Sequence, residues 1–572
     1  MNLSSTIKSI QDIMRKDDGV DGDAQRIGQL TWMLFLKVFD EREEEWEANG
    51  KKRGDTYVSP LAVSYRWRNW AIFVPDEEGK PQPKIPAEKL IAFVNGELFP
   101  FLQSIEVNND PVRKVIRQVF EDSNNYMKSG TLMLGVIEKL NEAIDFNDFK
   151  TRQNLGDIYE QILNDLRSAG NAGEFYTPRA ITQVMVELLD PHLDQGETIM
   201  DPACGTGGFL TASIDYFRKQ CGKELSAEEQ QAIENSFKGI EKKQLPHLLC
   251  TTNLLLHGID VPSQIEHMNT LARSWNAWTD ADQVDCVVTN PPFGGLEDDT
   301  AGDDYPEALR TRETSDMFIT LIVGKLLKQN GRCAVVLPDG FLFGEGVKGR
   351  IKERLMEECN LHTIIRLPNG VFAPYTSIKT NILFFTKGKP TETIWFYEHP
   401  YPEGRKSYSK TRPIRIEEFD AEKAWWGDEA NGFAERQESE LAWSIDFKGI
   451  KERAKAQAQP HWDKADDLNA QVTKLEAEIR DLRASISRVI DVAQREPVEA
   501  QIDKLRIDAD RLRRQASEAQ TIGDRLYWPI YNIDIKNPNS PEEKIDDPDE
   551  LLERYNQLLD DIRACYALYE IS

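Results

Sequence analysis

The sequence predicts an α/β protein built on a mostly parallel, doubly wound sheet, with a helical domain before it and a helical region after it. Between about residues 151 and 400, short apolar runs of the β type alternate with helical patterns, which is typical of βαβ units. A regular heptad pattern begins only beyond residue 460. We expect the last strands to form an antiparallel edge. The expected strands are 198–200, 237–240, 284–289, 333–337, 363–365 and 381–385.

Length and composition set limits on the class of protein. A chain of 572 residues is long enough for three or four domains with a large core. It has no run of 18 apolar residues, and its first 16 residues lack the apolar stretch of a signal peptide, so we expect a soluble, cytoplasmic protein. The seven cysteines are far apart and the seven histidines show no ligand spacing beside them, so neither disulfides nor a metal site are expected.

The net charge argues against a protein that holds DNA alone. There are 97 acidic and 70 basic residues, which gives a formal charge of −27, and such a surface repels a polyphosphate. If the substrate is DNA, a basic partner or a local basic lining must supply the phosphate contacts. An acidic surplus is also common in soluble proteins generally, and this explains most of the charge equally well.

The first 150 residues are predicted to form a helical packing domain without chemistry of its own. Ile27, Leu30, Leu34 and Val38 lie on one face of a helix that begins after Asp17-Asp18-Gly19. Residues 151–400 are predicted to form the sheet domain in this division of the chain.

The remainder of the chain changes pattern twice. Residues 401–460 are rich in tryptophan and irregular, and we expect a linker region there. Residues 461–522 repeat apolar positions in steps of three and four on both sides of Pro497, which predicts an antiparallel helical hairpin with this proline near its tip. Such a hairpin either satisfies its own apolar seam or docks on a partner. Residues 523–572 are expected to be a tail with a helix that takes part in subunit contacts.

The most informative motif is Asn290-Pro291-Pro292-Phe293, directly after the apolar run 284–289. Two prolines make the turn stiff and leave carbonyl oxygens free to accept hydrogen bonds. The motif therefore presents an amide, a rigid carbonyl and an aromatic ring at the carboxyl end of a strand, where open α/β sheets bind ligands. This set suits a flat group with an exocyclic NH2, whose hydrogens Asn290 Oδ1 and the Pro291 carbonyl accept while Phe293 stacks on its plane. An ordinary strand-ending turn with a core phenylalanine is the alternative.

A second motif, residues 201–210, follows the run 198–200 and is rich in glycine. Glycines allow the backbone to approach a ligand and to turn into a helix whose first amides are free. The segment lacks the spacing of a dinucleotide fingerprint and the Lys-Ser/Thr of a phosphate loop. Its first residue, Asp201, favours a ligand with a positive end such as the ammonium of a methionyl group. Tight turns also use glycine for geometry alone.

Glu241 closes the next expected strand, where a carboxylate in a nucleotide-binding fold accepts hydrogen bonds from ribose hydroxyls. It follows Asp201 by 40 residues, and a charged helical stretch around 227–234 accounts for this long interval. A surface acid beside Lys242 and Lys243 is an equally good interpretation.

Together these motifs resemble the modification subunit of a type I restriction-modification system, an S-adenosylmethionine-dependent DNA adenine-N6 methyltransferase. The likeness covers about residues 1–450 and returns at 532–538, while the long heptad hairpin is a departure from it. The matching segments are, in order, 173–179, 201–210, Glu241, 269–271, 290–293, 331–340 and 367–372.

The resemblance implies a Rossmann-like methyltransferase sheet and a set of site residues. Asn290, Pro291, Pro292 and Phe293 would be the catalytic residues that hold the target base, with Phe372 behind Phe293. The implied ligands of S-adenosyl-L-methionine are Glu174, Tyr176, Thr177, Pro178, Asp201, Gly205, Thr206, Gly207, Phe209, Glu241 and Asn269. Among them, Asp201 and the glycines would hold the methionyl moiety, Glu241 the ribose and Asn269 the adenine ring.

The resemblance also implies partners. Chemistry on a paired base requires that the adenine be taken out of the stack. Sequence recognition would come from a specificity subunit bound by two modification subunits, and a restriction and translocase subunit would complete the assembly on double-stranded DNA. Two alternatives remain: a methyltransferase for another planar amine, such as cytosine N4 or a protein glutamine amide, and a catalytically silent assembly scaffold.

Overall fold

The structure is a computed structural model of the whole chain. It describes residues 3–53, 57–143, 176–222, 225–298, 302–409, 411–487 and 492–539, and three single positions beyond them. Among these residues, no helix is long and apolar enough to cross a membrane.

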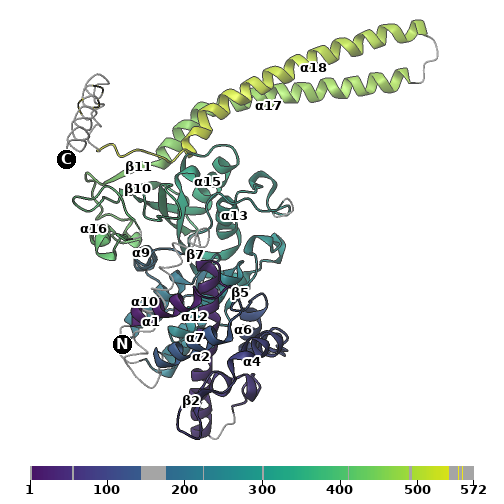
Figure 1. Cartoon of the computed structure of the whole chain (residues 1–572). Coiled ribbons are helices and arrows are strands. Elements are labelled where there is room, and N and C mark those ends of the chain that lie inside the picture. The colour runs from purple at the N-terminus through teal and green to yellow at the C-terminus, as the bar shows by residue number, and fades with distance from the viewer. Residues whose placement is uncertain are drawn as a thin grey trace.

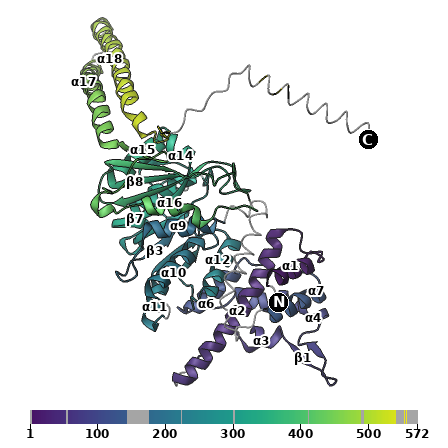
Figure 2. The same ribbon diagram turned by 90° about the vertical axis from the view of Figure 1, so that its left-hand side faces the viewer.

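The N-terminal domain is a helical bundle, as the sequence predicts. Its longest helix, α2, contains Ile27, Leu30, Leu34 and Val38, and all four side chains are buried in one core. The described elements are α1 (Leu3–Met14), α2 (Asp23–Arg53), α3 (Trp67–Trp70), β1 (Phe73–Pro75), β2 (Pro81–Pro83), α4 (Ala87–Phe93), α5 (Phe99–Gln103), α6 (Pro111–Phe120) and α7 (Gly130–Ala143). This domain lies at the opposite end of the molecule from the long helices α17 and α18 (Figures 1 and 2).

The second domain is built on a nine-stranded sheet in the order β11-β10-β8-β9-β7-β6-β3-β4-β5. The predicted α/β class with a mostly parallel, doubly wound sheet is confirmed, because β7, β6, β3, β4 and β5 are all parallel neighbours. The strands are β3 (Ile199–Asp201), β4 (Phe237–Glu241), β5 (Ile265–His267), β6 (Val284–Thr289), β7 (Leu327–Pro338), β8 (Cys359–Arg366), β9 (Thr380–Lys387), β10 (Thr393–Glu398) and β11 (Ala442–Asp446).

The sheet ends in an antiparallel edge, as expected, where the last strand, β11, pairs with β10. The last strand that the sequence predicts, 381–385, is also antiparallel but does not lie at that edge. Strand β9 is antiparallel to both β7 and β8 and lies between them, inside the sheet. Its residues alternate between the two faces: Ile382 and Phe384 enter one core, and Leu383 and Phe385 enter the other. A strand that is buried on both faces belongs in the sheet interior, and the apolar run 381–385 already had the composition of such a strand.

Helices cover both faces of the sheet. On one face α9 and α10 pack against the core that contains Ile199 and Val288, and on the other α13 and α15 pack against the core that contains Met200 and Val287. The helices of the sheet domain are α9 (Arg179–Leu189), α10 (Gly208–Cys221), α11 (Ala227–Asn235), α12 (Gln244–Leu256), α13 (Thr314–Leu321), α14 (Asp339–Phe343), α15 (Val347–Glu358) and α16 (Asp420–Trp425).

Helix α12 joins the two domains. Leu248 and Leu255 belong to the core of the N-terminal bundle, whereas Cys250 and Leu254 belong to the core under the sheet. At the start of the helix, Gln244 Nε2 donates to the carbonyl of Val119 on α6 at 2.6 Å. The helical domain is therefore packed directly on an element that follows strand β4.

The expectation that residues 401–460 form an irregular linker is wrong, because part of this stretch belongs to the sheet. Strand β11 lies in this stretch and pairs antiparallel with β10, which in turn pairs parallel with β8. Trp443 of β11 stacks on Phe396 of β10, with ring centroids 5.2 Å apart. Trp443 is a core residue of this sheet extension. The irregular spacing of the tryptophans in the sequence did not indicate the short strand β11. The other domain boundaries remain a proposal.

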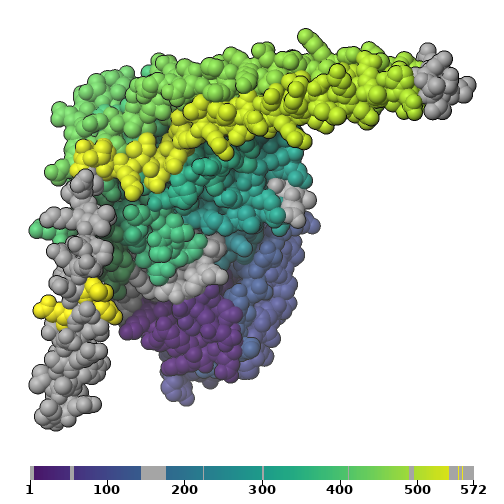
Figure 3. Space-filling model, turned by 90° about the horizontal axis from the view of Figure 1, so that it is seen from above, coloured from purple at the N-terminus to yellow at the C-terminus, as the bar shows by residue number. Residues whose placement is uncertain are grey.

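The heptad segment forms a long arm of two antiparallel helices, α17 (Phe447–Ile486) and α18 (Val492–Tyr527). Figure 3 shows the helices side by side along an arm that extends past the rest of the molecule. Alternate seam residues such as Val472, Ile479, Ile502 and Ala509 are buried between them. The arm begins earlier than expected, at Phe447, and Pro497 lies inside the first turns of α18. Residue Val489 of the predicted seam is outside the described residues.

The arm offers a matched test of its packing. Ile479 is 8% exposed in the seam, whereas Ile507 is 70% exposed on α18. We expect Ile479→Asp to destabilise the arm by about 3 kcal/mol, because it buries an unpaired charge, and Ile507→Asp to change its stability by less than about 0.5 kcal/mol. Hydrogen exchange of arm peptides measures both changes. Equal protection in the two variants would show that the seam is not the stabilising contact.

Candidate active site

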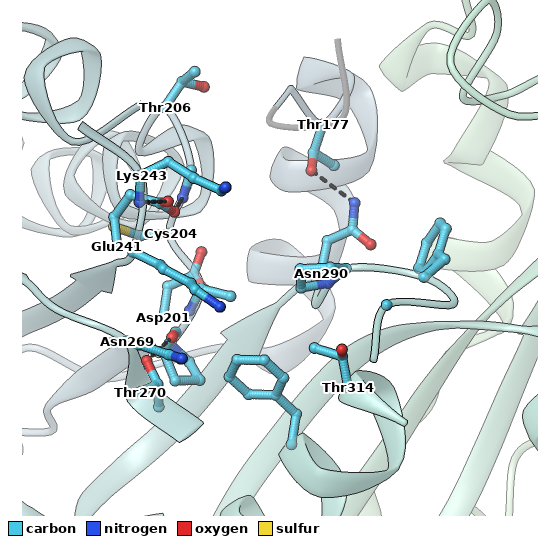
Figure 4. Close-up of a pocket in the computed structure, with 18 of the residues that line it drawn as sticks. Thr177, Asp201, Cys204, Thr206, Glu241, Lys243, Asn269, Thr270, Asn290 and Thr314 are labelled. Carbon is cyan, nitrogen blue, oxygen red and sulfur yellow. Dashed lines mark hydrogen bonds between the residues drawn. The ribbon is translucent and has the colours of Figure 1, made fainter. Parts of the chain in front are cut away.

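The candidate site is a cavity of about 440 Å³ at the carboxyl edge of the parallel strands. Loops that follow β3, β4 and β6 line it, because these three strands run in the same direction side by side. Figure 4 shows Asp201, Glu241 and Asn269 on one side of the cavity and Thr177, Asn290 and Thr314 on the other. Its size is within the range of small-molecule sites.

Asp201 lies at the end of β3 and is almost completely buried. Its Oδ1 accepts hydrogen bonds from Thr289 Oγ1 at 2.7 Å and from the Ala203 amide at 3.1 Å. Its Oδ2 is buried and has no hydrogen-bond partner among the described residues. Burial raises the pKa of this carboxyl group to about 7, and the Thr289 and Ala203 bonds oppose that shift. A buried acid with one oxygen unpaired is prepared for a cationic ligand.

Glu241 holds the glycine-rich turn in place. Its Oε2 accepts from the Gly205 amide at 2.9 Å, and its Oε1 accepts from the Lys243 amide at 2.6 Å. Gly205 and Gly207 have φ angles of 52° and 80°, in the left-handed region. A Cβ atom at Gly207 would lie 2.8 Å from the sulfur of Cys250, so this position excludes a side chain. Burial raises the pKa of Glu241 as well.

Asn290 faces the same cavity from the end of β6. Its Nδ2 donates to Thr177 Oγ1 at 3.0 Å, and this contact is drawn in Figure 4. Its Oδ1 is buried and has no partner among the residues that the structure describes. Thr177 therefore orients the amide so that its free atom is an acceptor. Phe293 meets the edge of Phe372 at a centroid distance of 5.9 Å, as the sequence predicts for the ring behind it.

Glu297 is a residue of this site that sequence reasoning missed. It is 8% exposed and lines the cavity. Its Oε2 accepts from Asn269 Nδ2 at 3.0 Å and lies 3.1 Å from Lys242 Nζ. The carboxylate thus connects the loop after the Asn-Pro-Pro-Phe motif to two residues on the other side of the cavity. In the sequence it precedes two aspartates, so it could not be distinguished from a solvated acidic run.

Most of the predicted site residues line this cavity. Those that line it are Thr177, Asp201, Gly205, Thr206, Phe209, Glu241, Asn269, Asn290, Pro292 and Phe293. Tyr176 lines a smaller recess together with Thr177 and Thr206. Pro178, Gly207 and Pro291 belong to the same loops but are not among the lining residues. Glu174 lies outside the described residues.

Comparison with known proteins identifies both parts of the chain. Residues 150–467 match the model of the family described as N-6 DNA Methylase. Residues 3–140 match the model described as HsdM N-terminal domain. The boundary between the two matches falls where the helical bundle gives way to the sheet domain.

Individual relatives agree with the family models. The methylase subunit of the type I restriction enzyme EcoEI from Escherichia coli is 53% identical over 502 residues, which cover 86% of this chain and 98% of that protein. A modification subunit of a putative type I restriction enzyme from Vibrio vulnificus YJ016 has a TM-score of 0.65 at 38% identity, covering 78% of this chain and 92% of the other.

A chain from a structural study of complex assembly and conformational transition in the type I R-M system has a TM-score of 0.69 at 30% identity and covers 100% of this chain and 99% of its own. All three relatives are named for type I systems, and the matches extend over most of their length. The chain therefore belongs to the N-6 DNA methylase family and, within it, to the methylase subunits of type I restriction enzymes.

Proposed function

We propose that this chain transfers a methyl group from S-adenosyl-L-methionine to N6 of an adenine that has been turned out of DNA, at a sequence chosen by a separate specificity subunit. One observation carries the proposal: two buried oxygens, Asp201 Oδ2 and Asn290 Oδ1, have no hydrogen-bond partner within the described part of the chain, and both belong to residues that line one cavity. One suits the ammonium of the methyl donor and the other the amine of the target.

The cofactor side of the cavity fits S-adenosylmethionine. Asp201 would pair with the ammonium, and the backbone at Gly205 would approach the methionyl part closely because no side chain intervenes. Both Glu241 oxygens accept a backbone amide, and each keeps a further lone pair for a ribose hydroxyl. Asn269, held by Glu297, would meet the adenine ring. When bound, S-adenosylmethionine supplies an electrophilic sulfonium methyl group.

On the other side, Asn290 Oδ1 and the Pro291 carbonyl would accept the two hydrogens of the target amine. The Phe293 ring would stack on the base, supported by Phe372. These contacts would hold the nitrogen lone pair toward the methyl group, so that in-line positioning supplies most of the acceleration as the N–C bond forms and the S–C bond breaks. The amine would lose one proton to solvent during or after the transfer, so no general base with a special pKa is needed. The N-6 DNA Methylase match favours adenine over the other planar amines.

In this proposal, partner subunits recognise the DNA sequence. A charge of −27 disfavours tight DNA binding by this chain alone, so we propose a basic specificity subunit clamped by two methylase subunits, with a restriction and translocase subunit added in the full complex. Because the substrate would be the cell's own DNA, the proposed site of action is the cytoplasm. The related type I proteins, including one from a study of complex assembly, support this arrangement.

The raised pKa of Asp201 gives a test of cofactor binding. Below about pH 7 the free protein carries this carboxyl group protonated, whereas an ammonium favours its ionised form. Binding must then release a proton, so the dissociation constant for S-adenosylmethionine should rise about tenfold for each pH unit below 7. Calorimetry between about pH 5.5 and 7.5 measures this. Asp201→Asn should bind more weakly and lose the dependence; a flat wild-type profile would contradict the assignment.

The catalytic amide is tested by separating binding from turnover. Asn290→Ala removes one acceptor of the target amine, and kcat for methyl incorporation should fall about a hundredfold while cofactor affinity is kept. Thr177→Val removes the acceptor that orients Asn290 and should lower kcat about tenfold. The exposed Asn276→Ala serves as the control. Wild-type turnover in Asn290→Ala would mean that the motif is only structural.

The role of the arm is tested by two deletions. Trp462 Nε1 donates a hydrogen bond to Asp524 Oδ1 at 3.0 Å, so the two helices are adjacent at this level. A short linker can therefore join the two ends that remain after residues 463–520 are deleted. If the arm docks on the specificity subunit, this deletion should weaken the complex in size-exclusion chromatography and leave cofactor affinity unchanged. Removal of only 481–507 shows whether the outer half is required. Unchanged assembly in both variants would mean that the arm is self-contained.

A further inference from the structure

Three large apolar side chains are exposed around the candidate active site. Between Tyr176 and Asp446, the exposed large hydrophobic residues that the structure describes are Leu296, Phe343 and Ile378. Leu296 follows β6, Phe343 ends the helix after β7, and Ile378 precedes β9, which is antiparallel to its neighbours. All three therefore stand at the carboxyl edge of the sheet, the edge that holds the cavity. Elsewhere on the described part of this domain, the large apolar side chains are buried or half-buried.

Leu296 differs from the other two because it also lines the cavity. Its side chain is 69% exposed, and it follows the proposed base platform Phe293 by three residues. It thus belongs both to the surface that a duplex would meet and to the wall of the space that the extruded base would enter. Phe343 and Ile378 are not among the residues that line this space.

The loop that carries Leu296 is braced on both sides. Leu296 forms an antiparallel bridge with Glu313, the Glu297 amide donates to the Arg312 carbonyl at 3.0 Å, and the Thr314 amide donates to the Gly295 carbonyl at 3.0 Å. The neighbouring Glu297 side chain is fixed by Asn269 and Lys242. Because these contacts fix the loop, the exposed Leu296 side chain would keep its position when a ligand contacts it.

We propose that Leu296 is the wedge that enters the base stack of the DNA and fills the space left by the extruded adenine. This inference rests on the proposed function and deepens it. Extruding a base leaves a gap in the stack directly in front of the cavity that receives it, and apolar side chains such as leucine are suited to fill such a gap. In the free protein the exposed leucine is unfavourable, and insertion between bases removes it from water.

The test uses the complete complex with its specificity subunit. The target sequence is first read from the positions of N6-methyladenine in plasmid DNA that the complex has methylated. Duplexes are then prepared with 2-aminopurine, whose fluorescence rises when it leaves the stack, in place of the target adenine. The wild-type complex and Leu296→Met should give this rise, and Leu296→Ala should give less than about a third of it. Cofactor affinity should be equal in all three.

A second measurement separates a wedge from a merely structural residue. On a fully paired duplex, Leu296→Ala should lower kcat/KM about tenfold or more, because extrusion is unassisted. When the target adenine faces an abasic site, the base is already loosened, and the same variant should come within about threefold of wild type. Ile378→Ala, an exposed apolar residue on the same edge, should leave the ratio between the two substrates unchanged.

The possible failures are distinguishable. If the wild-type complex methylates no DNA, the proposed function itself is wrong. If it does, and Leu296→Ala is equally impaired on paired and abasic duplexes, or Ile378→Ala shows the same pattern, the wedge is not Leu296. Weakened association with the specificity subunit in Leu296→Ala would mean that this side chain meets protein rather than the base stack.

Discussion

The parallel pairing of β3 with β4 on one side and with β6 on the other is the constraint on which the site depends. Asp201, Glu241 and Asn290 are far apart in the chain, yet each ends or follows one of these strands, and Asp201 pairs with Gly239 while Met200 pairs with Val287. Parallel strands bring their carboxyl ends to one edge. A shift of one residue in either register would turn Asp201 or Asn290 to the other face, and both faces are filled by large cores that oppose such a shift.

Burial of the Asp201 carboxyl group costs stability in the ligand-free protein. Because burial raises the pKa of Asp201 from 3.8 to about 7, the folded protein binds more protons than the unfolded chain between these values, and the ligand-free protein loses stability as pH rises through this window. A further part of the cost is the buried Oδ2, which has no hydrogen-bond partner in the described ranges. A bound ammonium would remove both penalties. Asp201 would then lower the stability of the ligand-free protein and raise the stability of the complex. Asn290 Oδ1 has the corresponding position on the other side.

Much of the fold and site could be predicted because the relevant signals are local. Apolar runs that lead into Asp201, Glu241 or Asn290 indicate a strand together with a residue that lines the cavity. What was missed depends on contacts between distant segments: β9 takes its central place by pairing with β7 and β8, and Glu297 acquires its role only through Asn269 and Lys242. Likewise, β11 is short, and its partner β10 lies more than forty residues earlier, so local periodicity could not show it.

The N-terminal bundle and the arm are attached to different parts of the same sheet. The N-terminal bundle packs through α12, the helix that follows β4, whereas the arm begins directly after β11 at the far edge of the same sheet. Phe447, the first residue of α17, and Tyr531, just after α18, share one core with the strands, so the base of the arm is anchored rigidly. A partner bound along the arm would therefore transmit its orientation to the sheet rather than to a flexible linker. Because the acidic chain cannot rely on its own surface to attract DNA, this rigid connection would let a partner's grip on the duplex set where the target adenine meets the cavity.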